Sequence, residues 1–205
     1  MNKSTIKIKR NTDYRLSFVT GGLYVSESKI LLQFYSDLNN WSLVLEKSVD
    51  QNIFQFNSNA STKRATREIC VRLQSLSTEE KAFYLDADIH DQSIIAWLAV
   101  CRTYKFIGDF ASKVIIESFE SYRLHIKYAD FDFFYEEQCQ WHPELDNIKE
   151  TTRKKLRQIL FRMMREAGLL THDKEIRPLT PSSTLNNLNL SIRQDIINFI
   201  PGVSL

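Results

Sequence analysis

The sequence has few of the residues that interrupt helices and few that build disulfide frameworks. Its 205 residues include only five glycines, four prolines and three cysteines. So few turn-forming residues favour long helices over a fold with many tight turns. The cysteines (Cys70, Cys101 and Cys139) are odd in number and lack framework spacing, and no signal peptide precedes them. We therefore expect a cytoplasmic protein with reduced thiols.

Sequence motifs of the common enzyme classes are also missing. There is no glycine-rich phosphate loop, no Gly-x-Ser-x-Gly, no His-Glu-x-x-His, and no Cys and His at catalytic spacing. Cys139 and His142 form half of a zinc-like Cys-x-x-His, but the remaining histidines (His90, His125 and His172) are isolated. No apolar run approaches the roughly 18 residues of a membrane-spanning helix. We expect no enzymatic activity, no metal, no cofactor, no small-molecule substrate and no membrane partner.

Charge is unevenly distributed along the chain, although the net charge is only +2. Residues 1–78 hold 11 basic and 6 acidic side chains, residues 79–148 hold 6 and 14, and residues 149–205 hold 10 and 5. Two basic ends therefore flank an acidic middle. We predict a mobile basic arm (1–13), an N-terminal helical unit (14–78), an acidic central helical core (79–148), and a C-terminal basic unit with its tail (149–205).

One stretch, residues 150–168, has the clearest pattern in the chain. Thr151 or Thr152 is a candidate N-cap, and Gly168 suits a helix end because glycine readily adopts positive φ. Apolar residues recur at the spacing of a buried helical face. That face holds Leu156, Ile159, Leu160, Met163 and Ala167.

The opposite face of this helix is basic, and no acid occurs between Thr151 and Arg165. Basic helical faces are most often simply solvated. Here two features favour phosphate binding: the face is rich in arginine, and the helix follows a short polar segment, as the second helix of a helix-turn-helix does. The candidate DNA-binding residues are Lys154, Lys155, Arg157, Gln158, Arg162 and Arg165, with Arg153 beside Arg157 on one flank.

A second basic helix is predicted over residues 61–76. Ala65, Ile69, Leu73 and Leu76 form its buried stripe. Lys63, Arg64, Arg67 and Gln74 point away from that stripe, and the three cations are further DNA-binding candidates.

The remaining pattern completes an all-α prediction with two helix-turn-helix-like units. Ser77 and Glu80 form a capping box for a helix ending near Asp86, and Asp91 or Ser93 opens the helix that should be most buried. A small hairpin, or wing, is plausible at 169–178. Further helices are expected at 26–38 (with Ser26 and Glu27 at its cap), 41–49, 106–122, 130–137 and 191–200.

Several segments resemble a known family. They are Thr152 to Gln158 with Met163 and Arg165 to Leu170, Trp141 to Leu145 (WHPEL), Phe18 to Leu23 (FVTGGL), and Ser61 to Glu68 (STKRATRE). The pattern resembles the BrxA family of BREX bacteriophage-exclusion (phage-defence) systems. The resemblance extends from about residue 14 to about residue 170.

This resemblance implies an all-helical protein that binds double-stranded DNA with little sequence preference. Its partners would be the other BREX proteins, among them a methyltransferase and an ATPase. The basic helices at 61–76 and 151–168 would be the second helices of the two helix-turn-helix-like units.

Two alternatives stay open at this point. A basic helix does not distinguish the backbone of B-form DNA from that of A-form RNA, so an RNA-binding helical domain fits the residues as well. An adaptor whose acidic middle docks a basic protein within the defence complex is the second alternative.

Overall fold

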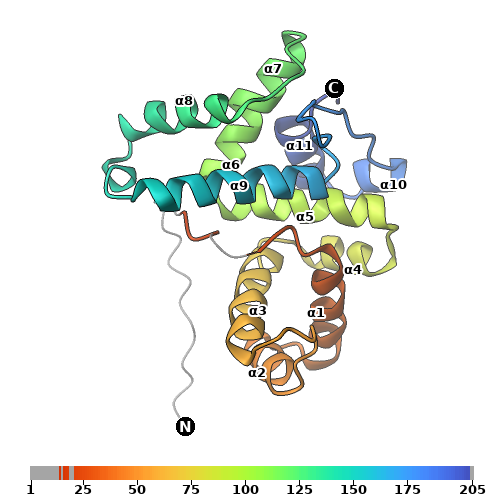
Figure 1. Cartoon of the computed structure of the whole chain (residues 1–205). Coiled ribbons are helices and arrows are strands. Elements are labelled where there is room, and N and C mark those ends of the chain that lie inside the picture. The colour runs from red at the N-terminus through yellow and green to blue at the C-terminus, as the bar shows by residue number, and fades with distance from the viewer. Residues whose placement is uncertain (1–13, 15, 19–20, 204–205) are drawn as a thin grey trace.

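Helices make up 67% of the residues that the structure describes, which confirms the all-α prediction. The computed structural model describes residues 14, 16–18 and 21–203 (Figure 1). The predicted arm at 1–13 lies outside the described residues. The elements are α1 (Val25–Leu38), α2 (Trp41–Asp50), α3 (Asn59–Leu73), α4 (Thr78–Asp86), α5 (Ile89–Thr103), α6 (Lys105–Phe110), the π-helix η1 (Ala111–Ile116), α7 (Glu117–Glu120), α8 (Tyr128–Cys139), the 3-10 helix η2 (Pro143–Leu145), α9 (Glu150–Glu166), α10 (Ser183–Asn186) and α11 (Leu190–Phe199).

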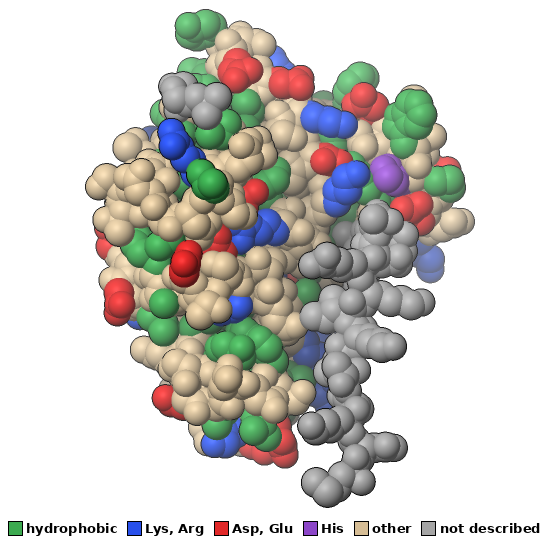
Figure 2. All heavy atoms as spheres, turned by 180° about the vertical axis from the view of Figure 1, so that it is seen from behind, with side chains coloured by type: hydrophobic (Ala, Val, Ile, Leu, Met, Phe, Trp, Pro, Cys, Tyr) green, Lys and Arg blue, Asp and Glu red, His purple; other side chains and the backbone are tan. Residues whose placement is uncertain are grey.

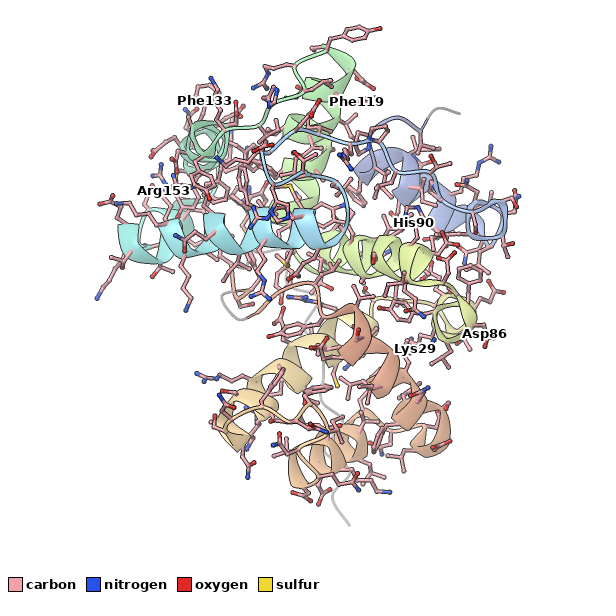
Figure 3. The ribbon with its side chains drawn as sticks, turned by 45° about the vertical axis from the view of Figure 1, so that its right-hand side comes forward. Lys29, Asp86, His90, Phe119, Phe133 and Arg153 are labelled. Carbon is pink, nitrogen blue, oxygen red and sulfur yellow. The ribbon has the colours of Figure 1, made fainter. Side chains whose placement is uncertain are left out.

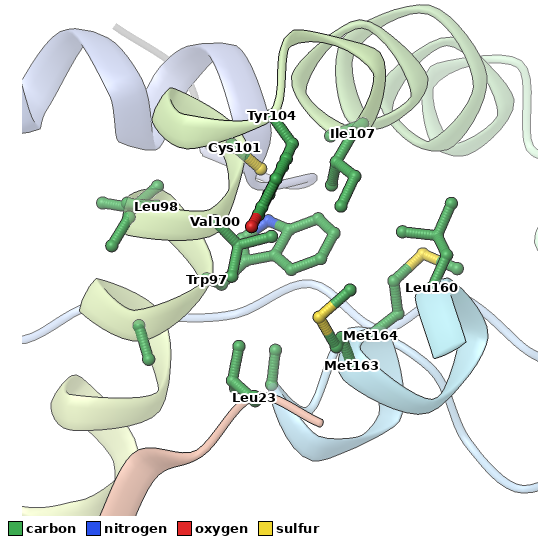
Figure 4. Packing of buried hydrophobic residues seen from close by; sticks show 14 of the residues in the cluster. Leu23, Trp97, Leu98, Val100, Cys101, Tyr104, Ile107, Leu160, Met163 and Met164 are labelled. Atoms are coloured by element: carbon green, nitrogen blue, oxygen red, sulfur yellow. The ribbon is translucent and has the colours of Figure 1, made fainter. Parts of the chain in front are cut away.

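Helix α5 is the central element of the fold, as its nearly continuous apolar sequence predicts. Every residue from Ile94 to Cys101 is buried. Trp97 is fully buried close to α9, and its indole N–H donates a hydrogen bond of 3.1 Å to the carbonyl oxygen of Phe199. Figure 4 shows Trp97 with Leu160 and Met163 of α9 beside it. Helix α5 therefore lies at the centre of the core, to which α9 contributes one side.

Helices α1, α2 and α3 pack against one another below α5, and the later helices lie above it (Figure 1). Local capping chemistry sets their boundaries. Asn39 ends α1 in the left-handed conformation, and the Asn40 side chain caps the start of α2. Ser58 caps α3, and the predicted capping box of Ser77 and Glu80 is present at α4. Polar caps with short linkers thus fold the first half of the chain.

Three predicted helix starts are wrong by a few residues. Helix α9 begins at Glu150, so Thr151 lies inside its first turn rather than at the cap. Helix α5 begins at Ile89 because the Asp88 carboxylate accepts a hydrogen bond from the backbone N–H of Asp91. Helix α1 begins at Val25, after Tyr24 in the left-handed conformation, so Ser26 is not its cap.

The predicted wing at 169–178 takes the form of an irregular loop with isolated antiparallel bridges. Leu170 pairs with Ile176, and His125 pairs with Glu175 across the loop. The backbone N–H of Arg177 donates to the carbonyl of Leu169 at 2.9 Å. In the described part of the chain these bridges are the sole β structure. The two ends of the loop therefore pair with each other, and the loop also pairs with the segment before α8.

Candidate nucleic-acid interface

The two faces of α9 are separated as the sequence predicts. Leu156, Leu160 and Met163 are completely buried, and Ile159 and Ala167 are nearly so. On the other side Lys154, Lys155, Gln158 and Arg162 are exposed, while Arg157 and Arg165 are partly covered.

Acidic residues of α8 bind one flank of α9, which the sequence of α9 alone did not indicate. Arg153 pairs with Glu136 and, at 3.5 Å, with Asp132; Arg157 pairs with Asp132. Figure 3 shows Arg153 on the side of α9 that faces α8. The acids are four residues apart on α8 and the arginines are four apart on α9, so each pair shares one helical face. The acidic middle of the chain therefore supplies counter-ions to the basic helix.

Aromatic rings of α8 hold the same two arginines. The guanidinium carbon of Arg153 lies 4.7 Å from the ring centre of Tyr135, and that of Arg157 lies 4.6 Å from the ring centre of Tyr128. Burial alone would lower the pKa of Arg153, but the hydrogen bond and charge of Glu136 outweigh it and raise that pKa. The Arg157 side chain is only 17% exposed. The charged group of Arg157 therefore binds residues of α8 rather than facing solvent.

Glu166 partly neutralises the C-terminal end of the basic face. Its Oε1 accepts a hydrogen bond of 2.7 Å from Nε of Arg162, and this hydrogen bond is the main cause of a raised pKa for Arg162. Its Oε2 accepts a hydrogen bond of 2.5 Å from the backbone N–H of Leu23. Glu166 thus connects α9 to the loop that precedes α1.

The basic side chains of α3 divide into an exposed set and a buried one. Lys63, Arg64 and Arg67 are exposed and form no ion pair with any residue that the structure describes. Arg72 is buried instead. It donates to the carbonyl of Gly22 at 2.8 Å and to Glu68 at 2.9 Å. The exposed set alone is available to a ligand.

Three of the segments that carried the family resemblance meet around Gly22. Its carbonyl binds Arg72, which in turn binds Glu68 at the end of the STKRATRE segment. An added Cβ at Gly22 would lie 2.7 Å from Oε1 and 2.9 Å from Cδ of Glu166, so a larger residue would require the Glu166 carboxylate to move. A shallow groove of about 540 Å³ opens at the junction and is lined in part by Tyr24, Arg162 and Glu166. These motif residues therefore join α3 to α9.

The WHPEL segment holds the start of the described chain. The His142 ring stacks on Tyr14, with ring centres 3.6 Å apart, and Glu144 accepts a hydrogen bond of 3.3 Å from the backbone N–H of Tyr14. Leu145 is buried, and its carbonyl accepts a hydrogen bond of 2.8 Å from the hydroxyl of Tyr135. Across the described ranges, no three His, Cys, Asp or Glu side chains are grouped to hold a metal ion.

The predicted DNA-binding residues that remain available lie on two helices. Within the described chain Lys155 and Arg165 of α9 also form no ion pair, and Lys154 pairs with Glu150 at the surface, where both side chains are mostly exposed. Figure 3 shows nitrogen-tipped side chains on the lower edge of α9 and on the outer side of the three-helix unit beneath it. The rear face of the molecule instead mixes basic, acidic and hydrophobic side chains (Figure 2). Of the residues predicted to bind DNA, the available cations are thus Lys63, Arg64 and Arg67 of α3 and Lys155 and Arg165 of α9.

Neither helix follows a short helix-turn-helix connection. Residues 51–58 connect α2 to α3, a longer link than the roughly three- to four-residue turn of that motif. The α-helix before α9 is α8, and residues 140–149 lie between them, with only the single 3-10 turn of η2 in that link. No helix among the described residues has the length and apolar character needed to cross a membrane.

Comparison with known proteins agrees with the motifs that meet around Gly22. A family model described as BrxA matches residues 12–190. The chain belongs to the BrxA family. A relative described as "BREX protein BrxA" from Bacillus cereus is 27% identical over 136 residues, which is 66% of this chain and 68% of the relative. BrxA membership places the chain among the BREX phage-defence proteins and confirms the resemblance seen in its sequence.

The BrxA chain also shares its fold with a protein of known structure. The match is described as the crystal structure of an uncharacterized protein from Magnetospirillum magneticum, with a TM-score of 0.75 and 19% identity. It covers 91% of this chain and 97% of the other.

Proposed function

We propose that this BrxA protein is a non-catalytic, double-stranded-DNA-binding component of its BREX system. The duplex is held by phosphate contacts from α3 and α9, with little dependence on base sequence. Proteins of the same system are its other partners. The observation that carries the proposal is the set of exposed cations on α3, namely Lys63, Arg64 and Arg67, which have no acidic partner among the described residues.

The charge pattern of α9 supports the same conclusion. Lys155 and Arg165 also form no ion pair with a described residue. Lys154 pairs with an exposed carboxylate that a phosphate can replace at small cost, and the Arg162 side chain is 59% exposed beside Glu166. Arg157 instead stabilises the contact of α9 with α8, so its part in binding is indirect. The proposed phosphate-contacting set is Lys63, Arg64, Arg67, Lys154, Lys155, Arg162 and Arg165.

Weak sequence preference follows from the chemistry of these residues. Phosphate contacts position a protein on DNA without reading its bases, so different duplexes should bind almost equally. Gln158 is exposed on α9 beside Lys154 and Lys155, and its side-chain amide can pair with adenine. Gln158 is therefore the residue on which any base preference would depend.

A competition experiment tests which nucleic acid the protein binds, duplex DNA, duplex RNA or a single strand. A labelled DNA duplex is bound to the purified protein and displaced by unlabelled duplex DNA, duplex RNA of the same sequence, or either single strand. We expect duplex DNA of any sequence to compete best. If duplex RNA competes equally well or better, the RNA-binding alternative replaces the proposal.

The expectation of no catalysis has its own test. The protein is incubated with duplex DNA, or with ATP, in the presence of Mg²⁺. We expect neither DNA cleavage nor ATP hydrolysis. Nuclease activity that survives purification and disappears in Asp132→Asn but remains in Arg157→Ala would contradict the proposal, because both variants break the same ion pair.

A further inference from the structure

Two large aromatic side chains are exposed on α8 and in the turn that follows it, Phe133 in the helix and Trp141 two residues after its end. Phe133 is 76% exposed and Trp141 is 74% exposed, while Phe131, Phe134 and Tyr135 of the same helix are buried. Figure 3 shows Phe133 pointing outward from α8, away from α9. Large aromatic residues are depleted at solvated surfaces and enriched in protein interfaces.

An acid lies between the two aromatic residues in the sequence. Phe133 and Glu137 are four residues apart on α8 and lie on the same side of it, because a helix turns by about 40° over that spacing. Trp141 is four residues beyond Glu137, in a turn in which its N–H donates to the carbonyl of Gln138 at 3.1 Å. Phe133, Glu137 and Trp141 therefore form the exposed face that leads to the C-terminal end of α8.

The surroundings of this face are acidic. Residues 128–148 contain six acidic side chains and no lysine or arginine. Asp130 is paired with Arg123, and Asp132 and Glu136 are used by the arginines of α9. Glu137 and Asp146 are exposed and pair with no described cation. A partner must therefore offer apolar side chains at the centre and basic ones at the rim.

We infer that the face formed by Phe133, Glu137 and Trp141 docks a basic amphipathic helix of another protein of the BREX system. Its acidic rim repels the phosphates of nucleic acid and of anionic lipid, so neither fits this face. Phe133 lies on the side of the molecule away from the three-helix unit that carries Lys63, Arg64 and Arg67 (Figure 3). Partner and DNA can therefore bind at the same time.

The test uses each purified protein of the BREX system as a separate probe against the full-length chain. Phe133→Ala with Trp141→Ala is the test variant, and Leu190→Ala, an equally exposed apolar truncation on α11, is the matched control. We expect one probe to bind the wild type and the control equally. The test variant should bind it at least about tenfold more weakly, as loss of aromatic anchors does at other interfaces.

Further measurements separate the outcomes. Glu137→Lys should weaken the same interaction, and higher salt should weaken it in the wild type, because the partner is basic. Thermal unfolding and DNA affinity should be unchanged in every variant, since these side chains are exposed. If no probe binds, or if a probe binds without loss in the aromatic variant, the inference is wrong. It is also wrong if sedimentation shows that the face instead joins two copies of this chain.

Discussion

Asp132 of α8 binds Arg157 of α9, and this ion pair separates the basic residues of α9 that contact α8 from those that face solvent. The same carboxylate also contacts Arg153 at 3.5 Å, so two of the arginines on α9 are used to attach α8. The lysines on the solvent side of α9 have no such role. Substitution of the arginines that contact α8 should therefore affect mainly stability, and substitution of the lysines should affect mainly DNA binding.

Arg157→Ala and Lys155→Ala provide the first prediction. Arg157→Ala should lower the free energy of unfolding by about 1–3 kcal/mol, because it removes the closer of the two ion pairs of Asp132 and the contact with the Tyr128 ring, and leaves only Arg153 at 3.5 Å. It should leave the salt dependence of DNA binding nearly unchanged. Lys155→Ala should leave the free energy of unfolding nearly unchanged and should make the salt dependence of DNA binding shallower. Urea unfolding and DNA titration on both variants measure this, and a large loss of stability in Lys155→Ala with none in Arg157→Ala would reject the assignment.

The second prediction concerns the contact of Gly22 with Glu166. Gly22→Ala should cost about 1–3 kcal/mol of stability, because the new methyl group must displace the Glu166 carboxylate from its hydrogen bond with the N–H of Leu23. Glu166→Ala removes the obstacle, so Gly22→Ala should cost much less in that background. A double-mutant cycle of unfolding free energies measures the coupling. Additive effects would show that the loop and α9 do not depend on each other.

The third prediction concerns acid sensitivity and rests on Glu80. This fully buried carboxylate binds Arg102 at 2.6 and 2.8 Å. Burial by itself would raise the pKa of Glu80, but Arg102 and the Ser77 backbone lower it, and the net pKa lies below the ordinary value of 4.5. The unfolded state then binds more protons than the folded state near that value. Glu80 therefore stabilises the fold above about pH 4.5, and this stabilisation is lost as pH falls through the lowered pKa.

The comparison of wild type with Glu80→Gln measures this contribution. At neutral pH the variant should be less stable by about 3 kcal/mol, because Arg102 loses a buried charged partner. At lower pH the free energies of unfolding of the wild type and the variant should become more similar. Asp195 has the opposite effect on the pH dependence of stability. Burial raises its pKa, so the folded state binds more protons at this group than the unfolded state, and acidification stabilises the fold through Asp195. A difference between the two proteins that is constant from pH 7 to pH 3 would refute the role of Glu80.

Much of the fold follows from local sequence chemistry. The buried stripes of α3 and α9, the burial of α5 and the capping box of Ser77 are all read from spacing alone. The pairing of α8 with α9 is a tertiary contact, so single-helix patterns do not reveal it. A signal was present nonetheless, because Asp132 and Glu136 have the same i, i+4 spacing as Arg153 and Arg157.

The candidate site was less predictable than the fold. Periodicity separates the exposed cations of α3 and α9 from their buried stripes. It does not show that Arg72 is buried against Gly22, since this contact depends on the packing of segments 50 residues apart. Exposed Trp141 is likewise unexpected, because a large aromatic residue is more often part of the core.

The salt dependence of DNA binding tests the central proposal most directly. If α3 and α9 together neutralise about five phosphates, the slope of log K against log salt should be about −4.5, a loss of roughly 500-fold from 50 to 200 mM salt. Arg64→Ala with Arg67→Ala, and separately Lys155→Ala with Arg165→Ala, should each make the slope shallower by about two. Lys113→Ala with Arg193→Ala removes two exposed cations from η1 and α11 and should leave it unchanged. Equal slopes for the wild type and all three double variants would show that the two basic faces are merely solvated and contradict the proposal.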